Sequence, residues 1–126
     1  MDNFLDIAIQ YKGVPYKSGG MDKNGLDCSG LINLVTGQDK RVWTTSSNVP
    51  PPGTEEIKYK AISFNDFTSQ LLPGDILLWK GHAAFFVDEN TLFHARSSGK
   101  PADYTKDLQL YWLKVQGYPK VYRQCQ

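Results

Sequence analysis

Cys28 is the side chain best placed in this sequence to act as a nucleophile. It follows Asp27 at the start of a stretch whose apolar residues have helical spacing, so the thiol is expected in the first turn of a helix. Unsatisfied backbone N–H groups and the positive end of the helix dipole lie there, and both lower a cysteine pKa and favour the reactive thiolate. The alternative is a buried structural cysteine that packs as a small hydrophobic residue.

The two histidines of the chain, His82 and His94, are predicted to lie on neighbouring strands of one hairpin. A three-residue loop over 88–90 suits the sequence, with Asn90 in the left-handed conformation. That loop would place His94 opposite Ala84, so that His82 would be its diagonal neighbour on the same face. A two-residue loop would place the imidazoles on opposite faces, because side chains alternate along a strand.

Cys28, His82 and His94 would together supply a nucleophile, a base and an orienting group. His82 would take the thiol proton to form a thiolate–imidazolium pair, and His94 would hold the ring of His82 in one orientation. Two alternatives remain open: two unrelated strand histidines, or a metal ion bound by all three side chains. The chain lacks the closely spaced Cys and His pairs of a zinc finger, and we expect neither a metal nor another cofactor.

The elements that must position these residues indicate an α+β fold, with helices first and an antiparallel sheet after them. Apolar spacing predicts one helix over 4–11 and another over 27–37. Residues 38–60 are polar and contain three consecutive prolines, so a long irregular loop is expected. Apolar segments bounded by turn residues predict strands at 76–79, 82–87, 91–95 and 119–123, and a short helix at 107–113.

The composition is that of one globular domain, which we expect to span residues 1–126. Fourteen Lys and Arg and thirteen Asp and Glu leave a net charge of +1, so no nucleic-acid partner is expected. The longest apolar run, Ala83–Val87, is far shorter than the ~20 residues of a membrane span. The acidic N-terminus lacks the features of a secretory signal, and we expect a monomer made in the cytoplasm without a signal peptide.

Two parts of the sequence resemble the NlpC-type cysteine endopeptidases of bacterial cell walls. The first is similar to the nucleophile region of that family and comprises Gly13–Gly20 and Gly25–Ile32. The second is similar to its histidine region and comprises Leu72–Leu77, His82–Phe85 and Phe93–Ala95. The cysteine precedes the histidines, as in the unpermuted branch of the papain-like superfamily. The resemblance implies a papain-like fold in which the nucleophile helix packs on a central antiparallel sheet.

By motif position, the resemblance implies Cys28 as nucleophile, His82 as base and His94 as the third polar residue. Tyr16 would present its hydroxyl near the oxyanion. The alternative for Tyr16 is a structural position in the wall of the core.

Asp27 and Ser29 match residues that bind the free amine or carboxylate of the substrate, although Ser29 could instead be an ordinary polar residue of a helix start. Trp43, in the long loop, would form a wall of the substrate groove. Charged groups that could meet substrate termini are Lys17, Arg96 and Lys100, with solvated surface charges as the alternative.

The resemblance further implies hydrolysis of peptidoglycan stem peptides, at bonds between γ-D-glutamate and diaminopimelate or at cross-links. Two alternatives keep the fold but change the function: an acyl-transfer or thioesterase enzyme that acts on lipids, and a non-catalytic module of a phage tail or secretion apparatus. We expect an interbacterial toxin effector, delivered by a contact-dependent secretion system into the periplasm or cell wall of a rival. The alternative routes to the substrate are a place on a phage tail and cytoplasmic recycling of imported wall fragments. Such a toxin would require a cognate immunity protein in the producing cell.

Overall fold

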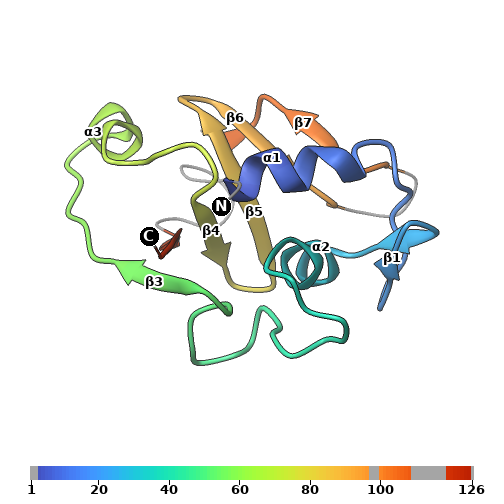
Figure 1. Ribbon diagram of the computed structural model, residues 1–126. Coiled ribbons are helices and arrows are strands. Elements are labelled where there is room, and N and C mark those ends of the chain that lie inside the picture. Colours follow the sequence, from blue (N-terminus) through green and yellow to red (C-terminus); the bar gives the residue numbers. More distant parts are fainter. Residues whose placement is uncertain (1–2, 97–99, 109–118, 126) are drawn as a thin grey trace.

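The computed structural model describes residues 3–96, 100–108 and 119–125 and is built on a six-stranded antiparallel sheet (Figure 1). The strands follow the order β3-β8-β4-β5-β6-β7 across this sheet. Their bounds are β3 Thr54–Ile57, β4 Ile76–Trp79, β5 His82–Asp88, β6 Thr91–His94, β7 Asp103–Thr105 and β8 Lys120–Gln124. A separate small ribbon pairs β1 (Met21–Asp22) with β2 (Gly25–Leu26) just before the helix that begins at Cys28.

Short polar side chains start the α-helices. The helices are α1 Phe4–Ala8, extended by a 3₁₀ turn over Ile9–Tyr11, α2 Cys28–Val35 and α3 Phe64–Ser69. Each α-helix follows a residue whose side chain accepts a hydrogen bond from the first-turn backbone: Asn3, Asp27 and Ser63. In the described ranges, no helix has both the length and the apolar character needed to cross a membrane.

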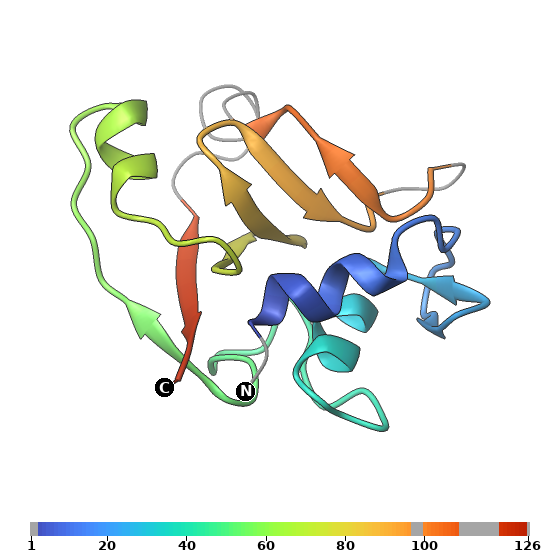
Figure 2. The same cartoon turned by 45° about the horizontal axis from the view of Figure 1, so that its top comes forward.

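The sheet is buried on both faces. One apolar cluster joins α1 and α2 to the sheet and includes Phe4, Leu31, Ile32, Ile76, Phe85 and Phe93. A second cluster joins α3 to the sheet and includes Phe67, Leu71, Leu77, Trp79, Phe86 and Val121. In both views, α1 and α2 lie together against the sheet, and α3 lies at the other end of the molecule from β1 (Figures 1 and 2). The predicted packing of the nucleophile helix on an antiparallel sheet is confirmed.

Five elements were missed by the sequence analysis, which are the short ribbon strands β1 and β2, the edge strands β3 and β7, and the helix α3. The region 38–60 is not wholly irregular, because β3 lies at its end and pairs with β8. β3 and β7 are the two edge strands, where exposed polar residues such as Glu55 weaken the apolar alternation that identifies a strand. The short helix α3 was also not predicted. The predicted helix at 107–113 falls largely outside the described residues.

Candidate active site

Cys28 is the first residue of α2, and the preceding loop packs closely against it. The Asp27 carboxylate accepts hydrogen bonds from the backbone N–H groups of Gly30 (2.7 Å) and Gly19 (2.8 Å). A Cβ atom on Gly30 would lie only 2.0 Å from the carbonyl oxygen of Gly20, so this close approach requires glycine. The predicted position of Cys28 at a helix N-terminus is confirmed.

The pKa of the Cys28 thiol is raised, and the direction expected from the helix dipole was wrong. Burial of the thiol is the largest cause, and the negative charge of Asp27 acts in the same direction. Backbone N–H groups of Ala83, Ser29 and Cys28 itself lower the pKa but do not outweigh the burial. The resting side chain is therefore a neutral thiol. The thiol contacts the backbone amide of Ala83, which is the residue directly after His82.

The two imidazoles lie side by side, as predicted, but the loop that produces this register differs from the expected one. His82 Nε2 and His94 Nδ1 are 2.7 Å apart, and the rings meet at an interplanar angle of 63°. Asp88 pairs with Thr91, so the turn has two residues instead of three. A bulge between Phe86 and Asp88 inserts one residue and restores the register that a three-residue loop would have produced.

Asn90 does not take the left-handed conformation that was predicted for it, because no described non-glycine residue has a positive φ. Its backbone N–H instead donates to the side chain of Asp88 at 3.3 Å. At the start of β5, the left-handed position of the turn before His82 is taken by Gly81, with φ +80°.

Both histidines are neutral at rest. Burial lowers the pKa of His82 to about 4, with a smaller lowering by Arg96 that the charge of Asp107 opposes. Burial likewise lowers the pKa of His94 to about 3, with contributions from His82 and Arg96 in the same direction. A neutral thiol and a neutral imidazole replace the expected thiolate–imidazolium pair.

Polar contacts continue beyond His94 toward the edge of the sheet. His94 Nε2 lies 2.8 Å from Thr105 Oγ1 on β7, and the Thr105 hydroxyl donates to Asp107 Oδ1. Arg96 Nη1 donates to the other oxygen of Asp107 at 3.1 Å. Arg96 therefore pairs with a neighbouring carboxylate and is not simply a solvated surface charge. Thr105 and Asp107 were not predicted, because the strand that carries Thr105 was not recognised.

Tyr16 lies next to the nucleophile helix. Its backbone forms an isolated bridge with Leu26, two residues before Cys28. Burial raises the pKa of the Tyr16 phenol, and the negative charge of Asp27, together with that of Cys28 once it is deprotonated, raises it further. The hydroxyl is therefore a neutral hydrogen-bond donor near Cys28.

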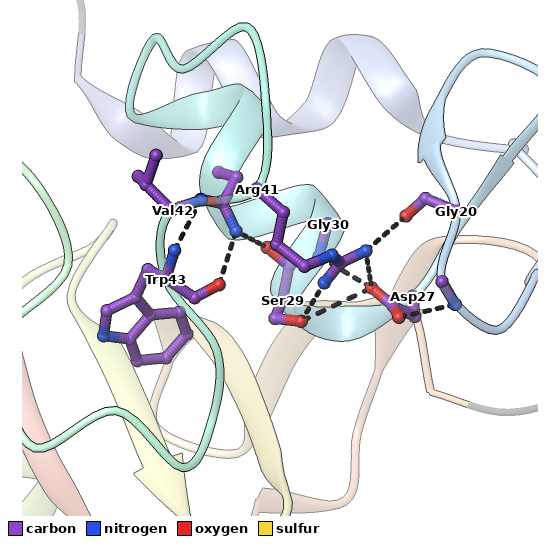
Figure 3. Close-up of polar contacts among 9 residues, drawn as sticks. Gly20, Asp27, Ser29, Gly30, Arg41, Val42 and Trp43 are labelled. Carbon is purple, nitrogen blue, oxygen red and sulfur yellow. Dashed lines mark hydrogen bonds and ion pairs between the residues drawn. The ribbon is translucent and has the colours of Figure 1, made fainter.

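Arg41 organises the side chains that were expected to bind substrate termini. It reaches from the loop after α2 back to the first turn of that helix, and its guanidinium lies between Ser29 and Asp27 (Figure 3). Arg41 Nη2 lies 3.0 Å from Asp27 Oδ1 and 3.1 Å from the carbonyl oxygen of Gly20, while Nη1 donates to the Ser29 hydroxyl. Asp27 and Ser29 are thus held by Arg41, which the sequence analysis did not single out.

The position of Arg41 follows from a buried amide. Asn33 is fully buried, and its Oδ1 accepts from the backbone N–H groups of Val42 (3.0 Å) and Trp43 (3.1 Å). Its Nδ2 donates to the carbonyl oxygens of Ser29 and Trp43, both at 2.7 Å. The expectation that Trp43 forms a groove wall was wrong, because the side chain is 1% exposed and packs in the core.

The predicted site residues divide into two groups. Cys28 lies against the backbone amide of Ala83, the residue after His82 on β5, while His94 pairs with His82 along the sheet and Tyr16 lies near the thiol. Asp27 and Ser29 instead belong to the cluster around Arg41. Over residues 3–96, 100–108 and 119–125, no group of three or more His, Cys, Asp and Glu side chains is arranged to hold a metal ion.

Residues 13–117 match the model of the NlpC/P60 family. The chain is 30% identical over 117 residues to the "Probable endopeptidase NlpC" of Escherichia coli, covering 86% of this chain and 70% of that protein. It is 26% identical over 98 residues to "Dipeptidyl-peptidase 6" of Lysinibacillus sphaericus, covering 78% of this chain. The chain spans only 33% of the length of the latter relative.

Solved structures agree with the family model on the fold. The NlpC/p60 domain of the peptidoglycan hydrolase SagA superposes with a TM-score of 0.61 and 23% identity, over 98% of this chain and 97% of that domain. This likeness covers the papain-like arrangement of α2 on the sheet. The chain therefore belongs to the NlpC/P60 family of cysteine peptidases, which hydrolyse peptidoglycan peptides.

Proposed function

We propose that residues 1–126 form one catalytic domain in which Cys28, His82 and His94 hydrolyse amide bonds in peptidoglycan stem peptides. The observation that carries this proposal is the 2.7 Å contact of His82 Nε2 with His94 Nδ1, next to the amide of Ala83 that faces the thiol. Because His94 engages Nε2 of His82, we assign Nδ1 as the ring nitrogen that accepts the thiol proton. Cys28, His82 and His94 would then act on one another in the order nucleophile, base and orienting group.

The neutral resting pair determines how the reaction begins. His82 Nδ1 accepts the thiol proton as the Cys28 sulfur attacks the amide carbonyl, so charge develops only as the new bond forms. Backbone N–H groups at the start of α2, with the Tyr16 hydroxyl, stabilise the oxyanion. The imidazolium of His82 then protonates the leaving amine, and a water deprotonated by His82 hydrolyses the thioester.

The cluster around Arg41 supports recognition of a substrate end. Asp27 would bind a free amine and Ser29 would bind a carboxylate, with Arg41 retaining both side chains at the helix start. A stem peptide offers both kinds of group beside the bond between γ-D-glutamate and diaminopimelate, and cross-links are the second class of bond. Substitution of Arg41 is expected to raise KM more than it lowers kcat, because Arg41 positions binding groups and does not touch the thiol.

The test is digestion of purified peptidoglycan, with the released fragments identified by mass spectrometry. Cys28→Ala is expected to abolish cleavage while the circular dichroism spectrum stays that of the wild type. Cys125→Ser is the matched control, since it removes the exposed cysteine and leaves the site intact. Residual turnover of Cys28→Ala above about a tenth of wild type would refute the assignment of the nucleophile.

We further propose that the protein is an effector toxin that is made in the cytoplasm and delivered to the periplasm or wall of a rival cell. Membership of a family that hydrolyses peptidoglycan peptides supports this, because such an activity would harm any cell whose wall it reaches. The producing cell would then hold an immunity protein that covers Cys28. Periplasmic expression of the wild type is expected to lyse a sensitive host, whereas Cys28→Ala is harmless; equal survival of both would contradict the toxin role.

A further inference from the structure

The polar chain behind the imidazoles crosses three neighbouring strands diagonally. In the register of β6 and β7, His94 pairs with Asp103 and Leu92 pairs with Thr105. Thr105 is therefore the diagonal neighbour of His94, just as His82 is its diagonal neighbour on β5. The three polar side chains are brought into one line by strand register alone, and Asp107 follows two residues after Thr105.

The carboxylate at the end of this line sets the direction of every hydrogen bond in it. Asp107 is paired with Arg96 and, as a carboxylate, can only accept. The Thr105 hydroxyl has one hydrogen, which it donates to Asp107, so toward His94 it can only accept. His94 must then carry its proton on Nε2.

The same rule continues to the catalytic base. A neutral imidazole has one N–H group, so a His94 protonated on Nε2 is an acceptor at Nδ1. His82 must therefore donate its Nε2 proton to His94, which leaves Nδ1 of His82 without a proton. This is the tautomer that can accept the proton of Cys28. If every hydrogen bond in this line ran in the opposite direction, Nδ1 of His82 would carry a hydrogen and could not accept the thiol proton.

We propose that Thr105 and Asp107 are positioning residues that select the catalytic tautomer of His82 through His94. The role in catalysis rests on the proposed function, whereas the tautomers themselves do not. Arg96 supports the same direction, since its ion pair keeps hydrogen-bond acceptors facing Thr105. The selection matters because both histidines are neutral at rest and each could otherwise exchange between two tautomers.

Burial and backbone contacts hold this line of hydrogen-bonded side chains, from His82 to Asp107, in place. His94 is only 1% exposed, and the side chain of Asp107 is 17% exposed, which limits competition from water. Asn90, in the turn between β5 and β6, binds the backbone on both sides of Asp107. Its side-chain Nδ2 donates to the backbone carbonyl oxygen of Lys106 at 3.2 Å, and its backbone carbonyl oxygen accepts from the backbone N–H of Leu108 at 3.3 Å. The turn that aligns the histidines therefore also fixes Asp107.

Nitrogen NMR of the imidazole rings tests the proposal on the intact protein without any substrate. The wild type is expected to show both histidines protonated on Nε2 near neutral pH. Thr105→Val should shift His94, and with it His82, toward a mixture of tautomers, while Thr105→Ser should retain the wild-type pattern because it keeps the hydroxyl. A His94 that carries its proton on Nδ1 in the wild type would overturn the proposal.

Activity provides the second readout. Thr105→Val is expected to lower kcat ~10–100-fold with little change in KM, the size of effect typical when a supporting hydrogen bond is lost. Asp107→Asn should lower kcat as well, because an amide can donate to Thr105 and so permits the opposite direction of hydrogen bonds along this line. Asp103→Asn is the matched control, since it removes a carboxylate from the same strand that contacts Lys12 at the surface.

The outcomes separate the two proposals. If peptidoglycan is not cleaved but the tautomers respond to Thr105→Val as described, the proposed function fails and the tautomer selection stands. If the wild type is active and Thr105→Val changes neither tautomer nor kcat, the tautomer selection is wrong and the catalytic assignment stands. A Thr105→Val protein that does not fold leaves the wild-type tautomers and Thr105→Ser to decide.

Discussion

Two Asp–Arg ion pairs of similar geometry lie behind the two halves of the candidate site, and they do different things. Asp27 and Arg41 are 3.0 Å apart near the thiol, and Asp107 and Arg96 are 3.1 Å apart behind the imidazoles. Asp27 accepts from backbone amides and holds the helix start, whereas Asp107 accepts from a hydroxyl that leads to His94. An ion pair next to backbone amides thus stabilises the local fold, whereas one connected to a titratable side chain can influence proton transfer.

The largest expected effects fall on the two reacting side chains, His82 and Cys28. His82→Ala removes the group that accepts and returns the proton, so kcat should fall ~10²–10⁴-fold, as for other general bases. Cys28→Ala should be at least as severe, because the covalent route is lost. Rates of fragment release from peptidoglycan measure both. A His82→Ala protein with near wild-type kcat would show that the two halves do not act as one site.

Acid should weaken the fold through the same imidazoles. Their pKa values in the folded protein, about 4 for His82 and about 3 for His94, lie below the ordinary value of 6.5. The unfolded chain therefore binds protons first as the pH falls. The contribution of neutral His82 to the free energy of unfolding is complete above pH 6.5. It declines between pH 6.5 and about 4, by on the order of 3 kcal/mol.

Urea unfolding across this pH range measures the decline. A protein with both His82→Gln and His94→Gln should show a flatter profile between pH 6.5 and about 5, where few carboxylates titrate. An identical slope in the double variant and the wild type would mean that other groups cause the acid sensitivity.

His94 should be partly replaceable, since it orients the base and does not take the thiol proton. In His94→Gln, the amide oxygen can accept from His82 Nε2 and the amide nitrogen can donate to Thr105, so kcat should fall only ~10–100-fold. His94→Ala should be worse, because neither contact remains. Steady-state kinetics of the two variants make the comparison. Equal losses in both would indicate that His94 acts through its shape and not through its hydrogen bonds.

Loss of the Asp27–Arg41 pair should act mainly on stability. Asp27→Ala removes a helix N-cap and is expected to lower the free energy of unfolding by ~1–2 kcal/mol. Asp107→Ala, in the other pair, should lower kcat with a smaller loss of stability. Urea denaturation with Asp39→Ala, an exposed carboxylate, as the control measures the difference. A larger loss of stability in Asp107→Ala than in Asp27→Ala would reverse the comparison.

The smallest effect is a displaced titration of the thiol. Because burial raises the pKa of Cys28, its alkylation by iodoacetamide should inflect above the ~8.5 of a free thiol. The measurement uses Cys125→Ser so that one thiol reports. An inflection well below that value, which His82→Ala abolishes, would show a thiolate–imidazolium pair at rest.

Local patterns in the sequence were sufficient for much of this site. Asp27 followed by helical apolar spacing predicted the position of Cys28, and apolar segments bounded by turn residues predicted β4, β5, β6 and β8 within about a residue. The pairing of His82 with His94 was predicted correctly from the wrong turn. A three-residue loop, and a two-residue loop followed by a bulge, place the same side chains on the same face of the hairpin. Only the observed pairing of β5 with β6 shows which of the two occurs.

The sequence by itself determined where the thiol and both imidazoles occur along helix and strand, since caps and alternation act over a few residues. Only the tertiary structure decided which groups stand behind them. Arg41 reaches α2 through a loop held by buried Asn33, and Thr105 reaches His94 through an edge strand that lacks a clear apolar pattern. It also decided the charge state of the site, because desolvation depends on packing by segments distant in the chain and here outweighs the helix dipole at Cys28.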